Sequence, residues 1–274
     1  MPELPEVESI RRYLVSKRLE GEKIQRVEVG WADSVAAPRH DIEGFANAVS
    51  GKRIAIIDRR GKYLIASLQD ESGTLSHLVL HMGMTGSVHI REPVETTVKY
   101  RRAVTYLGDG RRIELNDSRR WARLWCVEKP EDAFPNLGPE PWNLTPREFA
   151  RRVKSKRSRI KPALLDQNLV AGVGNIYADE ALHRSRILPL RRCNRISVAR
   201  LEILHSAIIA VLEHAIEFIS THPSADGSPY VVDAYDERMR ITRGTKSTCP
   251  DCDQVIVSRS ISGRTAYYCP RCQH

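Results

Sequence analysis

The sequence predicts an α+β protein of several domains: an N-terminal β-sandwich with a flanking helix, a C-terminal helical domain and a terminal zinc hairpin. Three observations predict this class. Short runs rich in β-branched residues fill the chain between residues 24 and 128. Helical periodicity dominates residues 145–222, and two CxxC pairs stand near the end of the chain.

The first domain is expected to span residues 1–129. It begins with a helix, because Val7, Ile10 and Leu14 recur at helical spacing, and Gly21 is expected to end that helix. The strand-like runs that follow are IQRVEVG, RIAIIDRR, KYLIASLQ, SHLVLHMG, RRAVTYLG, RRIELND and ARLWCVE. So many short strands predict a sandwich or a closed sheet.

A proline-rich stretch, residues 130–144, is predicted to be a linker. The helical domain follows at residues 145–222, where Thr145 and Pro146 form a good helix start and Ser197 can cap a long apolar helix. We interpret the apolar stripe of that long helix as core. Residues 223–246 are predicted to be a loop and connector, and residues 247–274 form the cysteine module.

The charge balance favours a polyanionic partner. The 274 residues include 43 Lys and Arg against 34 Asp and Glu, for a net charge of +9. Such an excess is typical of nucleic-acid-binding proteins, although a merely basic enzyme has the same balance. No run approaches a membrane-spanning length and no signal peptide is evident, so we expect a cytoplasmic, nucleoid-associated protein without a membrane partner.

Four of the cysteines have the spacing of a zinc ribbon. They are Cys249, Cys252, Cys269 and Cys272, in the sequences CPDC and CPRC. Four thiolates complete the tetrahedral coordination of Zn²⁺ and leave no position open for a substrate. The sequence therefore predicts one structural zinc ion per chain and no organic cofactor. In the hairpin between the two pairs, Arg264 is a candidate for a phosphate or base contact, with Gly263 at the turn.

An aromatic residue stands between arginines in DSRRWARLW, which contains Arg119, Arg120 and Trp121. An apolar wedge beside arginine can enter a base stack and fill the space of an extruded base. The alternative is a core tryptophan flanked by surface charges. Met84 in LHMGMTG and Lys62 in RRGKY lie in further glycine-containing turns.

The glycine-rich segment LVAGVGNIYADE leads into a helix. Exposed amides at a helix N-terminus bind anions, and Asn175 can add a side-chain donor there. The segment lacks the GK[ST] ending of a nucleotide-binding P-loop, so a phosphodiester is the more natural ligand.

The first residues, MPELPEVE, permit covalent catalysis. Removal of Met1 would leave Pro2 as a secondary amine with a reference pKa near 8, which is partly neutral at pH 7. Its adduct with an aldehyde-type carbon is an iminium that keeps its positive charge and favours elimination. Glu3 and Glu6 could act as acid or base. The alternative is an ordinary Pro-Glu helix start.

Taken together, these segments resemble bacterial formamidopyrimidine-DNA glycosylases from end to end. The shared segments, in chain order, are MPELPEVE, RRGKYL, HMGMTGS, DSRRWARLW, IKPALLDQNLVAGVGNIYADEAL and the CxxC pairs. The related endonuclease VIII branch typically has glycine where this chain has Leu4. PELPE therefore points to the branch that acts on purine lesions.

The resemblance implies a bifunctional glycosylase and lyase of base excision repair. Such an enzyme flips an oxidised purine (8-oxoguanine or a formamidopyrimidine) out of duplex DNA and attacks the sugar with Pro2. The Schiff base then cuts the strand by β,δ-elimination. Glu3 matches the catalytic acid/base, Glu6 the second acidic position, and Lys62 the hairpin lysine beside the lesion.

The resemblance also implies DNA contacts. Met84, Arg119 and Trp121 match the residues that fill the gap, and Arg119 is expected to face the orphaned cytosine. The positions that match phosphate contacts are His81, Arg120, Lys161, Asn175 and Arg264. Asn175 belongs to the helix–two-turn–helix motif of the family. Residues 223–246 match the region that closes over the flipped base.

Three departures from the family pattern bear on function. The family usually has Asp-Pro-Arg-Arg-Phe-Gly where this chain has DSRRWA, so Trp121 is a bulkier wedge. Residues 226–244 depart from the usual pattern, which leaves oxidised pyrimidines as alternative substrates. A retained Met1 would block Pro2. The alternative outside the enzymes is a non-catalytic protein that binds damaged DNA, and in every case we expect a monomer.

Overall fold

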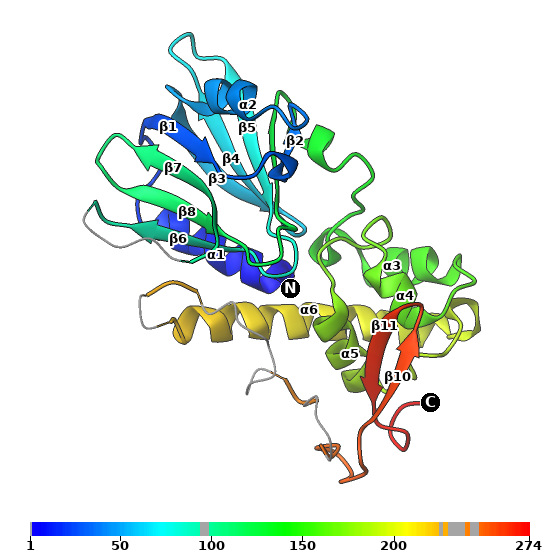
Figure 1. The fold of residues 1–274 in the computed structure, drawn as a ribbon. Helices are drawn as coiled ribbons and strands as arrows, with labels where there is room; N and C mark the ends of the chain where they lie inside the picture. The colour runs from blue at the N-terminus through cyan, green and yellow to red at the C-terminus, as the bar shows by residue number, and fades with distance from the viewer. Residues whose placement is uncertain (1, 94–98, 225–226, 230–238, 242–246) are drawn as a thin grey trace. The chain divides into compact units, whose positions relative to one another are not determined.

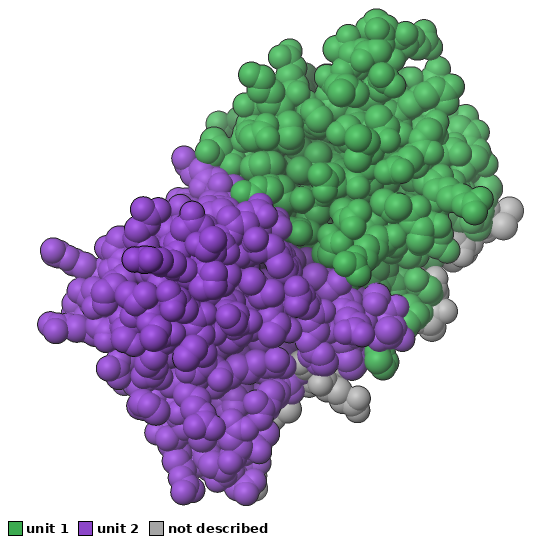
Figure 2. All heavy atoms as spheres, turned by 180° about the vertical axis from the view of Figure 1, so that it is seen from behind, with its two compact units in different colours: residues 1–2, 6–135, 222–231 green, residues 3–5, 136–221, 232–274 purple. Residues whose placement is uncertain are grey.

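The computed structural model describes residues 2–93, 99–224, 227–229, 239–241 and 247–274. The chain forms two compact units, which Figure 2 distinguishes by colour. The first unit consists of residues 1–2, 6–135 and 222–231, and the second of residues 3–5, 136–221 and 232–274. Each unit has its own hydrophobic core.

The first unit contains two β-sheets (Figure 1). One has the order β1-β7-β8-β6, and the other has the order β2-β9-β5-β4-β3. The strands are β1 (Ile24–Val29), β2 (Val35–Ala37), β3 (Arg53–Arg60), β4 (Tyr63–Gln69), β5 (Leu75–His81), β6 (Ser87–Arg91), β7 (Arg101–Leu107), β8 (Arg112–Asn116) and β9 (Arg123–Val127). All neighbours pair antiparallel except β2 and β9, which are parallel.

Helices complete the core of the first unit. In α1 (Leu4–Ser16) the predicted apolar residues Val7, Ile10 and Leu14 are buried in the core cluster. The helix ends at Ser16, five residues before Gly21, where it was expected to end. A second helix, α2 (Ile42–Val49), begins where the side chain of Asp41 accepts a hydrogen bond from the Gly44 N–H, 2.8 Å away. This helix was not predicted, because eight residues carry too little periodicity.

The second unit is built on four α-helices among its described residues. They are α3 (Pro146–Lys154), α4 (Ile160–Leu165), α5 (Asn175–Arg184) and α6 (Val198–Thr221). As predicted, Thr145 caps α3, and Glu148 completes a capping box with it. Short 3₁₀ helices at Pro130–Ala133 and Pro141–Asn143 stand within the predicted linker.

Helix α6 has the length and mean hydropathy of a membrane-spanning helix, so the prediction that no run approaches that length is wrong. Its apolar stripe nevertheless lies in the core of the second unit. The stripe residues Leu201, Leu204, Ile208 and Val211 are at most 2% exposed. A core helix of this kind satisfies the same criteria as a membrane span.

The chain closes with the hairpin of β10 (Val257–Ile261) and β11 (Arg264–Tyr268). Its two-residue turn places Ser262 and Gly263 at φ values of 50° and 76°, a conformation that matches the twist of the strands. The predicted fold class is therefore confirmed. Much of the predicted loop at residues 223–246 lies outside the described residues, as does Met1.

Candidate functional site

One carboxylate organises the turn after β8. Oδ1 of Asp117 accepts hydrogen bonds from the Arg119 N–H, 3.1 Å away, and from the Thr85 hydroxyl. Oδ2 accepts from the N–H groups of Trp121 and Ala122, at 2.6 and 2.8 Å. Burial opposes the charge, but these hydrogen bonds lower the pKa of Asp117 below its ordinary value. The backbone of the turn is thus fixed while its side chains are exposed.

Three predicted gap-filling side chains lie on two adjoining turns of the first unit. Met84 stands on the turn between β5 and β6, and its sulfur lies 3.9 Å from Nη1 of Arg119. Trp121 is 52% exposed, which is high for a side chain of this size. Gly83, at φ 63°, faces the Trp121 backbone, where a Cβ atom would lie 2.6 Å from the carbonyl carbon. Glycine is therefore required for the two turns to meet.

Arg120 lies beside an aromatic ring of the same unit. Its guanidinium is 5.9 Å from the centre of the Trp31 ring, and that of Arg123 is 5.4 Å from it. Cations at such distances are attracted by the face of an aromatic ring. Trp31 therefore restrains two positive charges next to the exposed turn.

His81 ends β5 as a neutral donor. Its Nδ1 accepts a hydrogen bond from the Gly83 N–H, 3.2 Å away, so the neutral ring carries its proton on Nε2. Burial, together with the positive charges of Lys62 and Arg123, lowers the pKa of His81 to about 4. His81 is accordingly uncharged at neutral pH.

The turn that carries Lys62 is fixed by a largely buried ion pair within the first unit. Nη1 of Arg59 donates to the Gly61 carbonyl at 3.0 Å, and Nε donates to Oε2 of Glu8 on α1 at 3.1 Å. Glu8 also accepts from Arg11 and Arg12. Burial opposes the charge of Glu8, but the three arginines lower its pKa from 4.5 to about 2.

Glu8→Gln is expected to destabilise the protein by about 2 kcal/mol at pH 7, allowing for partial solvent screening. Because the folded-state pKa lies below the unfolded value, this contribution is present above pH 4.5 and is lost as the pH falls towards 2. Urea unfolding should show the difference between wild type and variant shrinking by about half at pH 3. Glu71→Gln, at a side chain 90% exposed, is the control and should have no effect. A difference that is constant with pH would contradict this assignment.

The second unit holds the carboxylate of Glu3 at the start of α5. Oε1 of Glu3 accepts a hydrogen bond from the Ile176 N–H at 3.1 Å, and Glu3 is 1% exposed. The positive end of a helix dipole stabilises such a carboxylate. An amide that was predicted to bind an external anion therefore binds a carboxylate of the chain itself.

The glycines of the preceding loop make room for this segment. A Cβ atom at Gly174 would overlap the Glu3 carboxylate, and one at Gly172, which has φ 91°, would overlap the Leu4 side chain. The Leu4 N–H also donates to the Gly172 carbonyl at 3.3 Å. The VAGVG segment therefore packs closely against residues 3 and 4, which leaves no room for side chains at Gly172 and Gly174.

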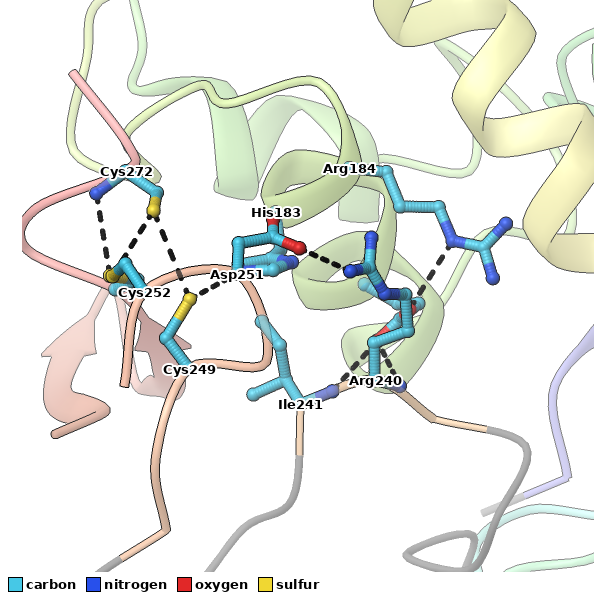
Figure 3. Close-up of polar contacts among 10 residues, drawn as sticks. His183, Arg184, Arg240, Ile241, Cys249, Asp251, Cys252 and Cys272 are labelled. Atoms are coloured by element: carbon cyan, nitrogen blue, oxygen red, sulfur yellow. Dashed lines mark hydrogen bonds and ion pairs between the residues drawn. The ribbon is translucent and has the colours of Figure 1, made fainter. Parts of the chain in front are cut away.

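The four predicted zinc ligands lie together (Figure 3 labels three of them). Their sulfur atoms are separated by 3.9 Å for Cys249 and Cys272, 3.5 Å for Cys252 and Cys269, and 3.4 Å for Cys252 and Cys272. Thiolates bound tetrahedrally to Zn²⁺ at about 2.3 Å lie about 3.8 Å apart. The residues fit a structural zinc ion with no open position.

Lys161 is placed in the interior of the second unit. It is 1% exposed, and its Nζ lies 2.7 Å from Oδ1 of Asp179 and 2.6 Å from the Thr265 carbonyl. Asp179 also accepts from the Tyr267 N–H at 3.2 Å. The ion pair therefore joins α4 and α5 to β11, and a direct contact of Lys161 with phosphate would require its amino group to leave these partners.

Comparison with known proteins finds three family domains in the chain and relatives that match it over its full length. Residues 1–124 match the formamidopyrimidine-DNA glycosylase N-terminal domain, residues 137–224 the H2TH domain of formamidopyrimidine-DNA glycosylase, and residues 246–274 a zinc finger found in FPG and IleRS. The formamidopyrimidine-DNA glycosylase of Pelotomaculum thermopropionicum is 36% identical over 283 residues, which cover 100% of this chain and 99% of that protein. The chain belongs to the formamidopyrimidine-DNA glycosylase family.

Solved structures of family members agree with this assignment. The Lactococcus lactis Fpg in complex with abasic-site DNA has a TM-score of 0.86 at 28% identity, covering 100% of both chains. MutM in complex with DNA containing carbocyclic 8-oxo-G has a TM-score of 0.85 at 29% identity, with the same coverage. The predictions of the family and of the four-cysteine zinc site are confirmed.

The other predicted residues of this family member are distributed over both units. Pro2 and Glu6 are buried. Asn175 is the first residue of α5, and Arg264 is the exposed first residue of β11. Their roles, like those of the other catalytic and DNA-contacting residues, stay predictions.

Sequence reasoning missed residues that position the predicted ones. Asp117 precedes a turn, and an aspartate at that place is a known signal for hydrogen bonding to following amides. Glu8 stands within MPELPEVE, but nothing local indicates its pairing with Arg59, 51 residues away. The proximity of Trp31 to Arg120 has no sequence signal either.

Proposed function

We propose that the chain is a bifunctional DNA glycosylase and lyase that removes oxidised purines from duplex DNA in base excision repair. After removal of Met1, Pro2 attacks the anomeric carbon of the damaged nucleotide and displaces the base. Glu3 transfers protons, with Glu6 as the second acidic group and Lys62 at the backbone beside the lesion. The Schiff base then undergoes β,δ-elimination, which cuts the strand.

The observation that carries this proposal is the placement of Glu3. Its carboxylate is buried, accepts from the Ile176 N–H and is enclosed by the loop at Gly174. A flexible Pro-Glu helix start would need no such enclosure. Because Glu3 is bonded directly to Pro2, fixing its carboxylate limits where the Pro2 nitrogen can lie.

The proposed DNA contacts follow from the exposed turns and from the relatives. Structures of similar proteins contain DNA with abasic or 8-oxo-G lesions. Met84, Arg119 and Trp121 would occupy the space of the flipped base, as their grouping on two turns supports. The proposed phosphate contacts are His81, Arg120, Lys161, Asn175 and Arg264. We further propose that the protein acts as a monomer on nucleoid DNA.

Excision from a panel of duplexes tests the proposed substrate. The panel contains 8-oxoguanine, formamidopyrimidine, an oxidised pyrimidine and an abasic site, each opposite cytosine or its usual partner. We expect faster excision of the two purine lesions, with strand cutting at the abasic site. A preference for the oxidised pyrimidine would refute the substrate assignment. Binding without excision or cutting of any duplex would refute the enzymatic function.

Gly174→Ala tests whether the fit around Glu3 matters for the reaction. The added methyl group would displace the Glu3 carboxylate, so we expect base excision to slow about 100-fold, the scale of a lost general acid or base. Single-turnover excision of 8-oxoguanine measures the effect. Gly30→Ala is the matched control, because a Cβ there would lie 3.7 Å from its nearest neighbour, the Arg102 carbonyl oxygen, which is an ordinary contact outside the proposed site. Equal rates for the two variants would contradict the positioning role.

A further inference from the structure

A buried histidine that the proposed function does not use lies against the zinc cluster. His183, on the last turn of α5, is 0% exposed, and its Nε2 lies 3.3 Å from Sγ of Cys249 (Figure 3). Its Nδ1 is buried and has no hydrogen-bond partner among the described residues. Among the residues that the structure describes, the ring therefore makes its polar contact with a sulfur of the zinc site.

The chemistry of the sulfur fixes the direction of this hydrogen bond. A zinc-bound cysteine is a thiolate, which only accepts, so Nε2 of His183 must carry the hydrogen. The ligand atoms of His183, Cys249 and Asp251 also lie within 4.8 Å of one another. That group has three members and shares Cys249 with the complete four-cysteine set, so His183 belongs outside the coordination sphere.

Helix α5 also binds the segment of the chain that precedes the first cysteine pair. Oε2 of Glu180 accepts from the N–H groups of Arg240 and Ile241, each at 3.1 Å. The side chain of Arg240 in turn pairs with Asp251, which lies between Cys249 and Cys252 in the sequence (Figure 3). Helix α5 thus holds both the segment that leads to the zinc site and the site itself.

We propose that His183 is a positioning residue of the zinc site: its Nε2–H donates to the Cys249 thiolate, orients that ligand and slows the release of zinc. A donor to a coordinated thiolate also withdraws electron density from the sulfur, since partners outside the coordination sphere tune both the geometry and the electronic properties of a metal site. The hydrogen bond further couples zinc occupancy to α5, whose first turn binds Glu3.

Zinc release and the spectrum of the cobalt-substituted protein test this role. His183→Phe keeps an aromatic ring of similar size but removes the donor. We expect zinc transfer to a chromogenic chelator to become about 10-fold faster, the lower end of the range for such partners. In the Co²⁺ protein the thiolate-to-metal charge-transfer band should move to lower energy. Neither readout depends on glycosylase activity.

Two further sets of variants make the test specific. His205→Phe is the matched control, because His205 is a buried histidine of the same unit that contacts the Pro141 carbonyl and has no contact with the zinc cluster. It should leave both readouts unchanged. The side-chain amide nitrogen of Gln lies where His has Nε2, so His183→Gln keeps a donor to Cys249 and should restore slow release of zinc. The amide nitrogen of Asn lies where His has Nδ1, so His183→Asn should not restore it. Wild-type release and spectrum in His183→Phe, or equal release from the Gln and Asn variants, would overturn the proposal.

Discussion

A chain whose N-terminus is extended by one residue that is not removed is expected to form no borohydride-trapped adduct with abasic-site DNA. In that chain the Pro2 nitrogen is an amide, which is not nucleophilic. As a free secondary amine it has a reference pKa near 8, and its iminium adduct keeps its positive charge. We expect the trapping rate to fall by at least about 10³-fold, as when other enzymes lose their nucleophile.

The trapping experiment separates chemistry from binding when it is made at saturating DNA. Occupancy is checked by fluorescence anisotropy with a duplex that carries a tetrahydrofuran abasic analogue, which has no aldehyde and cannot be trapped. The processed chain should give an adduct under the same conditions. If the extended chain were trapped as fast as the processed chain, another amine, such as that of a lysine, would be the nucleophile.

Loss of zinc, by chelation or by Cys269→Ser, is expected to weaken DNA binding by at least about 100-fold. The module has a very small core, consisting of Ile241, Ile256, Cys249 and Cys269 with a few partly buried neighbours. A core of that size does not fold without its metal. Arg264, a proposed phosphate contact, stands on this hairpin, and Lys161 donates to the Thr265 carbonyl next to it.

The zinc prediction is measured as DNA affinity at a fixed salt concentration, with the metal content of each sample determined in parallel. Fixed salt is necessary because phosphate contacts make affinity strongly salt-dependent. Cys126→Ser is the control, since Cys126 lies on β9 in the first unit, outside the cluster. Its affinity should match wild type. Undiminished affinity of a sample with verified zinc loss would contradict this role of the hairpin.

Features that depend on local patterns could be predicted from the sequence. The cysteine spacing predicted the zinc site, and β-branched runs predicted most strands of the sandwich. The strands β2 and β6 were not predicted, and β2 has only three residues, too few to show an alternating pattern. Hydropathy alone could not distinguish whether α6 is a core helix or a membrane-spanning helix, because a helix of either kind consists mainly of apolar residues.

The arrangement of the candidate site depends on contacts that no local pattern encodes. The hydrogen bond from Ile176 to Glu3 joins residues 173 positions apart in the chain. The only trace of this contact in the sequence is Gly174, where a larger residue would overlap the Glu3 carboxylate. Nothing in the sequence near Lys161 indicates that its side chain is buried, whereas the structure pairs it with the buried Asp179. Similarity to a family supplied the candidate residues, and the structure adds the hydrogen bonds and contacts that hold several of them in place.

The most direct measurement is the chemical identity of the residue joined to DNA. Wild-type protein with Met1 removed is incubated with an 8-oxoguanine:cytosine duplex, reduced with borohydride and digested, and the cross-linked peptide is sequenced by mass spectrometry. The proposed function predicts that the sugar remnant is attached to the nitrogen of Pro2. Attachment to Lys62 or to any other residue, or no adduct with any lesion, would contradict it.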